Sequence, residues 1–160
     1  MSLFCNDTGG FVERLTTVLN GLSAITISSW IRAAATGAGI GDRGWITHNL
    51  PDGRDRFVNL RYDQSGFYNS ALSNCVKAGV ELNGGDELSM ETISNTQTTE
   101  WQHVLFTWES GSEIQIYLDG VLSNDANGSN GGVTTGTISS ADRIIIGKGV
   151  KETGGTLTWN

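Results

Sequence analysis

Residues 101–122 read WQHVLFTWESGSEIQIYLDGVL, and this stretch decides the fold class. Apolar side chains occupy every second position in two short runs, first Val104, Phe106 and Trp108 and then Ile114, Ile116 and Leu118. A period of two predicts strands that are buried on one face only. The turn residues at 109–112 and 119–120 join these strands into antiparallel hairpins, because glycine adopts positive φ without steric cost.

Comparable segments occur on both sides of this stretch. Strands are predicted within 24–33, 45–48, 57–62 and 143–147, and two weaker ones within 76–93. The chain has 22 glycines and one proline among 160 residues, which is typical of many short strands joined by tight turns. We therefore predict one all-β domain over 1–160, with about ten or more short antiparallel strands in two packed sheets, because a single sheet would leave its apolar face in water.

Several local expectations follow from the same patterns. Phe11, Val12, Leu15, Val18 and Leu19 have helical spacing, which indicates a short helix or a turn. Residues 123–136 are rich in Asn, Gly and Ser and are predicted to form a long surface loop. The strand at 143–147 carries three consecutive isoleucines, Ile144, Ile145 and Ile146, which predicts burial on both faces.

The tryptophans divide by position. Trp101 and Trp108 are predicted to anchor the core as large apolar side chains. Ile25, Ile27 and Ile31 share one face of their strand, and Trp30 lies on the opposite, polar face.

Composition excludes some classes of protein. The net charge is -7 and the cations are scattered, which argues against nucleic-acid binding. The chain contains no apolar run of membrane-spanning length, and its first residues, MSLFCNDTGG, lack the features of a signal peptide. Cys5 and Cys75 match no metal motif, so they are either two unpaired thiols or one disulfide that ties the N-terminus to the body in an oxidising compartment.

Four motifs carry a family resemblance. LSAITISSWI at 22–31, WQHV at 101–104, IYLDGV at 116–121 and IIIG at 144–147 resemble, in order and spacing, the strands of laminin-G-like, concanavalin A-like jelly rolls. The resemblance implies a jelly-roll sandwich, a lectin-like binding role and an extracellular or cell-surface location.

One feature departs from the family pattern. Members usually continue past the position of 154–155 with a closing strand, whereas this chain ends at Trp159 and Asn160. The closing strand is absent, the N-terminal segment replaces it, or a partner chain supplies it. An unpaired edge is a pairing site, so we expect a homo-oligomer formed through an exposed strand edge.

The sequence offers no catalytic constellation. Related glucanases carry two glutamates and an aspartate close together on one strand, whereas Glu113 and Asp119 lie six residues apart, about 20 Å along a strand. His103 belongs to the tryptophan motif and is expected to be structural, and His48 is read as a surface residue. The chain is therefore predicted not to be an enzyme.

Binding is the remaining role, with a glycan or a protein surface as the partner. The candidate ligand-binding residues combine aromatic side chains, which stack on sugar rings, with polar groups that fix orientation: Trp45, Tyr68 and Tyr117, with Asn59, Arg61 and Asn69, and with Trp30 as an addition. Calcium is the only cofactor considered, with Asp63, Asp125 and Asn127 as oxygen donors. The alternative is a self-assembling sandwich, such as a shell or fibre component.

Overall fold

The computed structural model describes residues 11–33, 43–49, 58–65, 73–130, 132–147, 150–153 and 156–159. These residues form thirteen strands, which are β1 (Val12–Leu15), β2 (Ala24–Ile31), β3 (Arg43–Asn49), β4 (Val58–Ser65), β5 (Ser73–Glu81), β6 (Glu87–Thr92), β7 (Gln102–Glu109), β8 (Gln115–Leu118), β9 (Val121–Leu122), β10 (Asn124–Asn130), β11 (Arg143–Ile146), β12 (Val150–Thr153) and β13 (Thr156–Trp159). No helix in the described part of the chain is long and apolar enough to cross a membrane.

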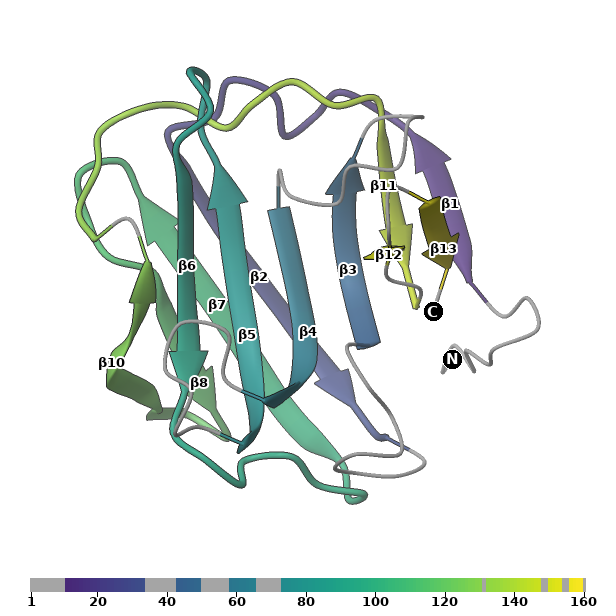
Figure 1. Ribbon diagram of the computed structural model, residues 1–160, viewed down its shortest axis with the longest axis vertical. Coiled ribbons are helices and arrows are strands. Elements are labelled where there is room, and N and C mark those ends of the chain that lie inside the picture. The colour runs from purple at the N-terminus through teal and green to yellow at the C-terminus, as the bar shows by residue number, and fades with distance from the viewer. Residues whose placement is uncertain are drawn as a thin grey trace.

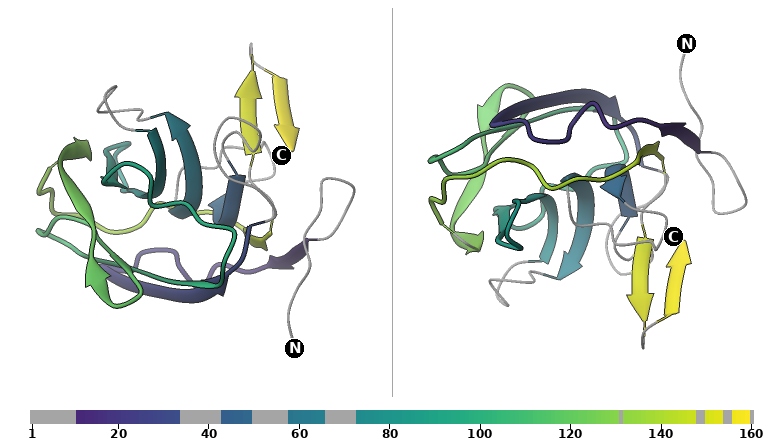
Figure 2. Two further views of the ribbon diagram at one scale, coloured as in Figure 1. Left: turned by 90° about the horizontal axis from the view of Figure 1, so that it is seen from below. Right: turned by 90° about the horizontal axis from the view of Figure 1, so that it is seen from above.

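The strands form two facing antiparallel sheets. The larger sheet has seven strands in the order β1-β11-β3-β4-β5-β6-β10, and the smaller has four in the order β2-β7-β8-β9. Figure 1 shows the smaller sheet behind the larger one, and Figure 2 shows the two layers from their ends. The strands β12 and β13 pair with each other. This arrangement confirms the predicted jelly-roll sandwich.

The core lies between the inner faces of the two sheets. Its largest fully buried apolar side chains come from both layers: Tyr62, Leu60, Leu82, Leu88, Phe106, Trp108, Ile116 and Ile138. The predicted alternation is confirmed in β7, where Val104, Phe106 and Trp108 are buried and the residues between them are not. At the turn after β8, Asp119 has φ 50° and Gly120 has φ 83°, as a tight hairpin turn requires.

The helix considered for the N-terminal segment is wrong. Residues 12–15 are strand β1, which pairs antiparallel with β11, with Val12 opposite Ile146. Residues 18–21 are a turn. Long-range pairing with β11 outweighs the local helical spacing, because it gives the backbone groups on one side of β1 hydrogen-bond partners.

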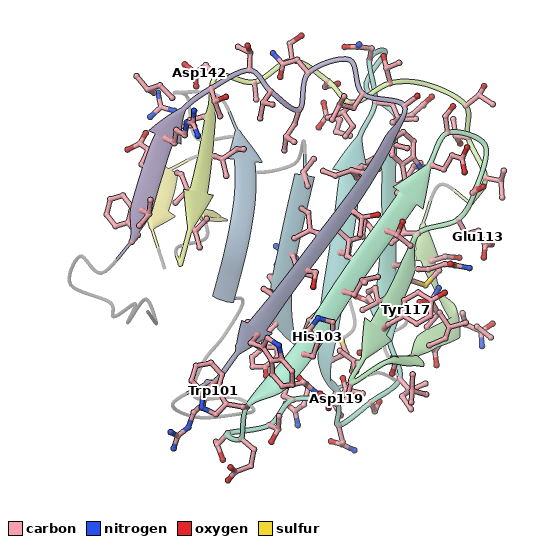
Figure 3. All side chains as sticks on the ribbon, turned by 180° about the vertical axis from the view of Figure 1, so that it is seen from behind. Trp101, His103, Glu113, Tyr117, Asp119 and Asp142 are labelled. Carbon is pink, nitrogen blue, oxygen red and sulfur yellow. The ribbon has the colours of Figure 1, made fainter. Side chains whose placement is uncertain are left out.

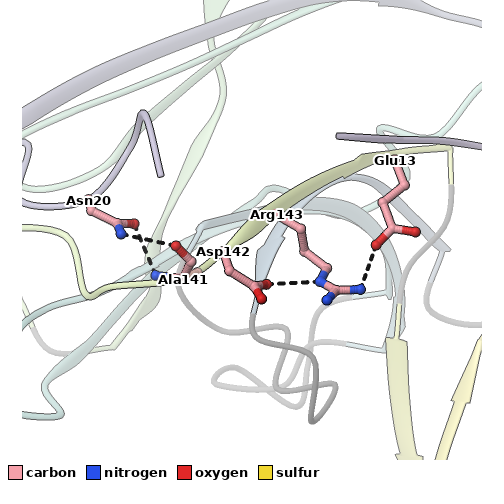
Figure 4. Close-up of polar contacts among 5 residues, drawn as sticks. All are labelled: Glu13, Asn20, Ala141, Asp142 and Arg143. Carbon is pink, nitrogen blue, oxygen red and sulfur yellow. Dashed lines mark hydrogen bonds and ion pairs between the residues drawn. The ribbon is translucent and has the colours of Figure 1, made fainter. Parts of the chain in front are cut away.

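Polar contacts fix this N-terminal segment to the chain before β11 (Figure 4). The Asn20 side chain donates to the Ala141 carbonyl at 3.0 Å and accepts from the Ala141 amide at 3.0 Å. The Arg143 guanidinium contacts Glu13 and Asp142, and these contacts, Asp142 first, raise the pKa of Arg143. The N-terminal segment therefore occupies an edge of the larger sheet.

Two further expectations are corrected. Within the predicted loop at 123–136, residues 124–130 form β10, which pairs with β6 through a bulge between Asn124 and Ser129. Its polar composition reflects its place at the sheet edge, where one side of the strand is unpaired in the described structure. The strand β11 is not buried on both faces, because Ile145 is fully buried but Ile146 is 41% exposed.

Candidate functional site

The outer face of the four-stranded sheet carries an unusual set of side chains. Alternation along β2, β7 and β8 turns a mixture of hydroxyl, amide and aromatic groups away from the core: Thr26, Ser28, Trp30, His103, Leu105, Thr107, Gln115 and Tyr117. Together with Trp101, which precedes β7, the members Trp30, His103, Leu105 and Tyr117 are called the aromatic face below. Trp30 is 64% exposed and Trp101 is 53% exposed. Exposed apolar side chains that gather on one sheet face mark it as a candidate interaction surface.

His103 supports Trp30 from the neighbouring strand. The two residues are register partners, their ring centroids lie 5.3 Å apart, and the ring planes are tilted by 52°. The His103 Nε2 atom forms a 2.8 Å hydrogen bond with the Ser28 hydroxyl. The His103 backbone is fixed as well, because its amide donates to Asp119 Oδ1 at 2.9 Å and its carbonyl accepts from the Asp119 amide at 2.8 Å. These contacts give the indole a defined neighbour on an otherwise open surface.

Figure 3 shows this arrangement from the outer side of the smaller sheet. Trp101, His103, Tyr117 and Asp119 lie toward one end of the sheet, and Glu113 lies toward the other end. The aromatic face is thus confined to one half of the surface.

The prediction that Trp101 anchors the core is wrong. Counting along β7 from the buried residues Val104 and Phe106 gives Trp101 the parity of His103, which points outward. This parity was available in the sequence and identifies Trp101 as an exposed residue. Trp108 has the inward parity and is 1% exposed, which confirms its predicted role.

Neutral hydrogen-bonding groups lie beside the aromatic side chains. The Tyr117 hydroxyl donates to Gln115 Oε1 at 2.9 Å, which leaves the Gln115 amide nitrogen as a donor toward solvent. The hydroxyls of Thr26 and Thr107 are 3.1 Å apart across β2 and β7. These groups can exchange hydrogen bonds with a ligand rich in hydroxyls.

A hollow of about 380 Å³ lies next to these residues, toward the β7–β8 turn. It is lined by Thr107, Trp108, Glu109, Ser112, Glu113 and Gln115. Both glutamates are exposed, so neither has the apolar surroundings typical of a glycosidase general acid. Sequence reasoning did not bring Glu109 and Glu113 together as a pair.

The predicted ligand-binding residues are divided between the two sheets. Tyr117 lies on β8 of the smaller sheet, whereas Asn59 and Arg61 lie on β4 of the larger one. Trp45 is on β3, in the bulge between Gly44 and Ile46. Tyr68 and Asn69 fall outside the described residues. The topology therefore brings Tyr117 onto the same sheet as Trp30 and separates it from Trp45, Asn59 and Arg61, which lie on the other sheet.

The predicted calcium ligands are also spread over the fold. Asp63 is on β4 and Asp125 is on β10, and β5 and β6 lie between these two strands. Three strand spacings are about 14 Å, far beyond the span of one ion. Asp125 Oδ1 accepts a 2.9 Å hydrogen bond from the Asn127 amide. Among the described residues no group of three or more His, Cys, Asp or Glu side chains could hold a metal ion.

The cysteines and the histidines complete the set of residues predicted from the sequence. Cys75 is buried on β5, and Cys5 falls outside the described residues, so their pairing stays a prediction. His48 is on β3, opposite Ile144 of β11. His103 lies on the outer surface, where its ring contacts Trp30 and forms a hydrogen bond with Ser28.

The fold and the face together define a jelly-roll β-sandwich with an exposed aromatic surface. A family model for the concanavalin A-like lectin/glucanases superfamily matches residues 6–159, and the chain belongs to this superfamily. No curated protein matches the chain.

Solved structures share the fold at low sequence identity. The binding domain of botulinum neurotoxin DC in complex with SialylT has a TM-score of 0.61 at 16% identity, over 88% of this chain and 32% of that one. The heptameric SAP-like pentraxin from Limulus polyphemus has a TM-score of 0.56 at 15% identity, over 94% of this chain and 64% of that one. A botulinum neurotoxin type C structure, described by its interaction with two ganglioside molecules, has a TM-score of 0.61 at 16% identity. The match covers 96% of this chain and 36% of that one. The chain thus spans about a third of each neurotoxin structure named here.

Proposed function

We propose that this domain is a non-catalytic glycan-binding module and that the aromatic face is its binding surface. The observation that carries the proposal is the pair of exposed indoles, Trp30 at 64% and Trp101 at 53% exposure. An indole stacks on the apolar face of a sugar ring, and neighbouring hydroxyl and amide groups fix the ring's orientation. The glycan ligands named for two of the similar structures support this class of partner. The family resemblance favours an extracellular or cell-surface location.

A glycan array tests the proposal. Wild-type protein is expected to give signals that Trp30→Ala loses, with and without a calcium chelator. Signals that vanish with chelator in the wild type would instead favour the calcium prediction and direct mutagenesis to Asp63, Asp125 and Asn127. An array without signals in either condition would contradict glycan binding and favour a protein partner.

Self-assembly is the second candidate, and one observation favours it. The edge strand β1 carries Leu15 at 72% exposure and Val12 at 45% exposure. Apolar residues on an edge strand are suited to strand addition from a second copy. Light scattering at high concentration tests this role, and a monodisperse monomer would contradict it.

A further inference from the structure

The distance between Trp30 and Tyr117 on the aromatic face exceeds the length of a single sugar ring. Trp30 lies on β2 and Tyr117 on β8, with β7 between them. Trp30 is the register partner of His103, and Tyr117 is the register partner of Leu105, two residues further along β7. Two strand spacings and one two-residue step separate the Cα atoms of Trp30 and Tyr117 by about 12 Å. One pyranose ring therefore cannot stack on both side chains.

The space between the two aromatic side chains is occupied by half-buried residues of β7. His103 and Leu105 fill this position, and both are intermediate in exposure. The hollow on this sheet lies elsewhere, toward Glu109 and Glu113. The aromatic face is thus a platform that a chain can cross, rather than a pocket that encloses a chain end.

The charges around the platform disfavour an acidic sugar. Asp119 adjoins His103 at the platform, and Glu109 and Glu113 line the hollow further along the same sheet. Arg32, just after β2, directs its Nε toward the Thr99 carbonyl at 3.2 Å. Recognition of a sugar carboxylate usually relies on a charge-assisted, often bidentate, hydrogen bond, and the Asp119 carboxylate opposes a second negative charge nearby.

We propose that the aromatic face takes an uncharged oligosaccharide of two or more rings, lying diagonally across β2, β7 and β8. One ring stacks on Trp30 beside His103, and another contacts Tyr117 beside Gln115. This inference rests on the proposed glycan-binding function and narrows its ligand class.

Calorimetric titration with two neutral series tests the inference. The probes are galactose, lactose and lacto-N-tetraose, then glucose, cellobiose and cellotetraose, with sialyllactose as the charged counterpart of lactose. In the series that binds, we expect the tetrasaccharide to bind on the order of tenfold more tightly than the monosaccharide, because the second ring adds a stacking contact. We expect sialyllactose to bind about fivefold more weakly than lactose at low salt, and added salt should reduce this difference in affinity.

Two variants separate the contacts. Trp30→Ala should weaken binding of every member of the series, whereas Tyr117→Ala should weaken binding of the tetrasaccharide more than binding of the monosaccharide. Asp119→Asn should reduce the difference in affinity between lactose and sialyllactose.

Some outcomes would overturn this inference and leave glycan binding intact. These are equal affinity for one ring and four rings, and tighter binding of sialyllactose than of lactose. Binding of none of the probes, together with an empty glycan array, would overturn the proposed function and the inference with it.

Discussion

The outer faces of the two sheets differ in what covers them. On the four-stranded sheet, the outward residues of β2, β7 and β8 are half-buried or exposed, and two indoles are open to solvent nearby. On the seven-stranded sheet, every residue from Cys75 to Val80 in β5 and from Leu88 to Thr92 in β6 is buried. The outer face of the smaller sheet is open to solvent, whereas the centre of the larger sheet is buried on both faces.

Charges on the larger sheet are part of its interior. Arg61, Lys77 and Glu91 are register neighbours across β4, β5 and β6. Lys77 is 3% exposed and Glu91 is fully buried. Buried opposite charges are expensive to separate, because the remaining charge keeps its desolvation cost. This row of charged side chains lies within the larger sheet, in contrast to the open polar groups of the smaller sheet.

The largest expected effect comes from breaking this row. Lys77→Met should destabilise the protein by about 3–5 kcal/mol, because Glu91 would remain buried opposite an apolar side chain. Urea denaturation measures the change. The double variant Lys77→Met/Glu91→Leu should recover part of the loss, and a single variant as stable as wild type would contradict this view of the larger sheet.

A smaller effect is expected where β10 lies against β6. A Cβ at Gly128 would lie 3.1 Å from Glu91 Cβ, from the Glu91 carbonyl oxygen and from Asp125 Cβ. Gly128→Ala should therefore cost about 1–3 kcal/mol, because backbone must shift to make room. Ser129→Ala on the same strand is the matched control and should change stability by less than about 0.5 kcal/mol. Equal stability of both variants would mean that β10 is not packed closely here.

Alkaline pH should lower the free energy of unfolding through the buried phenol of Tyr62. Burial raises the pKa of Tyr62 above its ordinary value of 10.0, and the hydrogen bond that the Thr98 amide donates to the Tyr62 hydroxyl oxygen at 3.5 Å opposes this shift only in part. The unfolded chain thus loses the phenol proton at lower pH than the folded protein does. Stability is full below pH 10 and falls as pH rises toward the folded pKa.

Denaturation midpoints at neutral pH and above pH 10 measure this effect. Tyr62→Phe should lose less stability over that interval than wild type does. The same loss in both proteins would assign the alkaline destabilisation to other groups.

The smallest effect on stability is expected on the smaller sheet. Trp30→Ala should change the free energy of unfolding by less than about 0.5 kcal/mol, because the side chain is mostly in solvent. Val18→Ala is a matched control, since Val18 is 63% exposed and Trp30 is 64% exposed. A loss well above that limit for Trp30→Ala would mean that the indole serves the fold, which would weaken its assignment to a binding surface.

The same contrast explains which parts of the fold could be predicted from the sequence. Strands β7 and β8 have one face exposed to solvent, so apolar and polar residues alternate along them. This alternation identified the hairpin and its inward residues. Residues 75–80 are buried on both faces, and such a strand has no clear period of two. The alternation rule therefore gave only weak strands there, and it gave no sign that Lys77 is buried.

Edges were the second source of error. The segment at 12–15 forms a strand by pairing with β11, which is far away in the sequence. The polar segment at 124–130 forms a strand by pairing with β6 through a bulge. Local spacing and composition do not encode such partners. At the candidate site, Tyr117 and Trp30 could be selected from their outward parity, whereas the support of Trp30 by His103 depends on the register of β2 with β7.

The central claim is that the smaller sheet, and not the larger one, binds the ligand. Calorimetric titration of wild type, Trp30→Ala and Arg61→Ala with the strongest array ligand tests it most directly, with urea denaturation to verify that each variant is folded. The account predicts that Trp30→Ala weakens binding by about tenfold and that Arg61→Ala binds as wild type does. Loss of binding in a folded Arg61→Ala with full affinity in Trp30→Ala would contradict it and move the site to the outer face of the seven-stranded sheet.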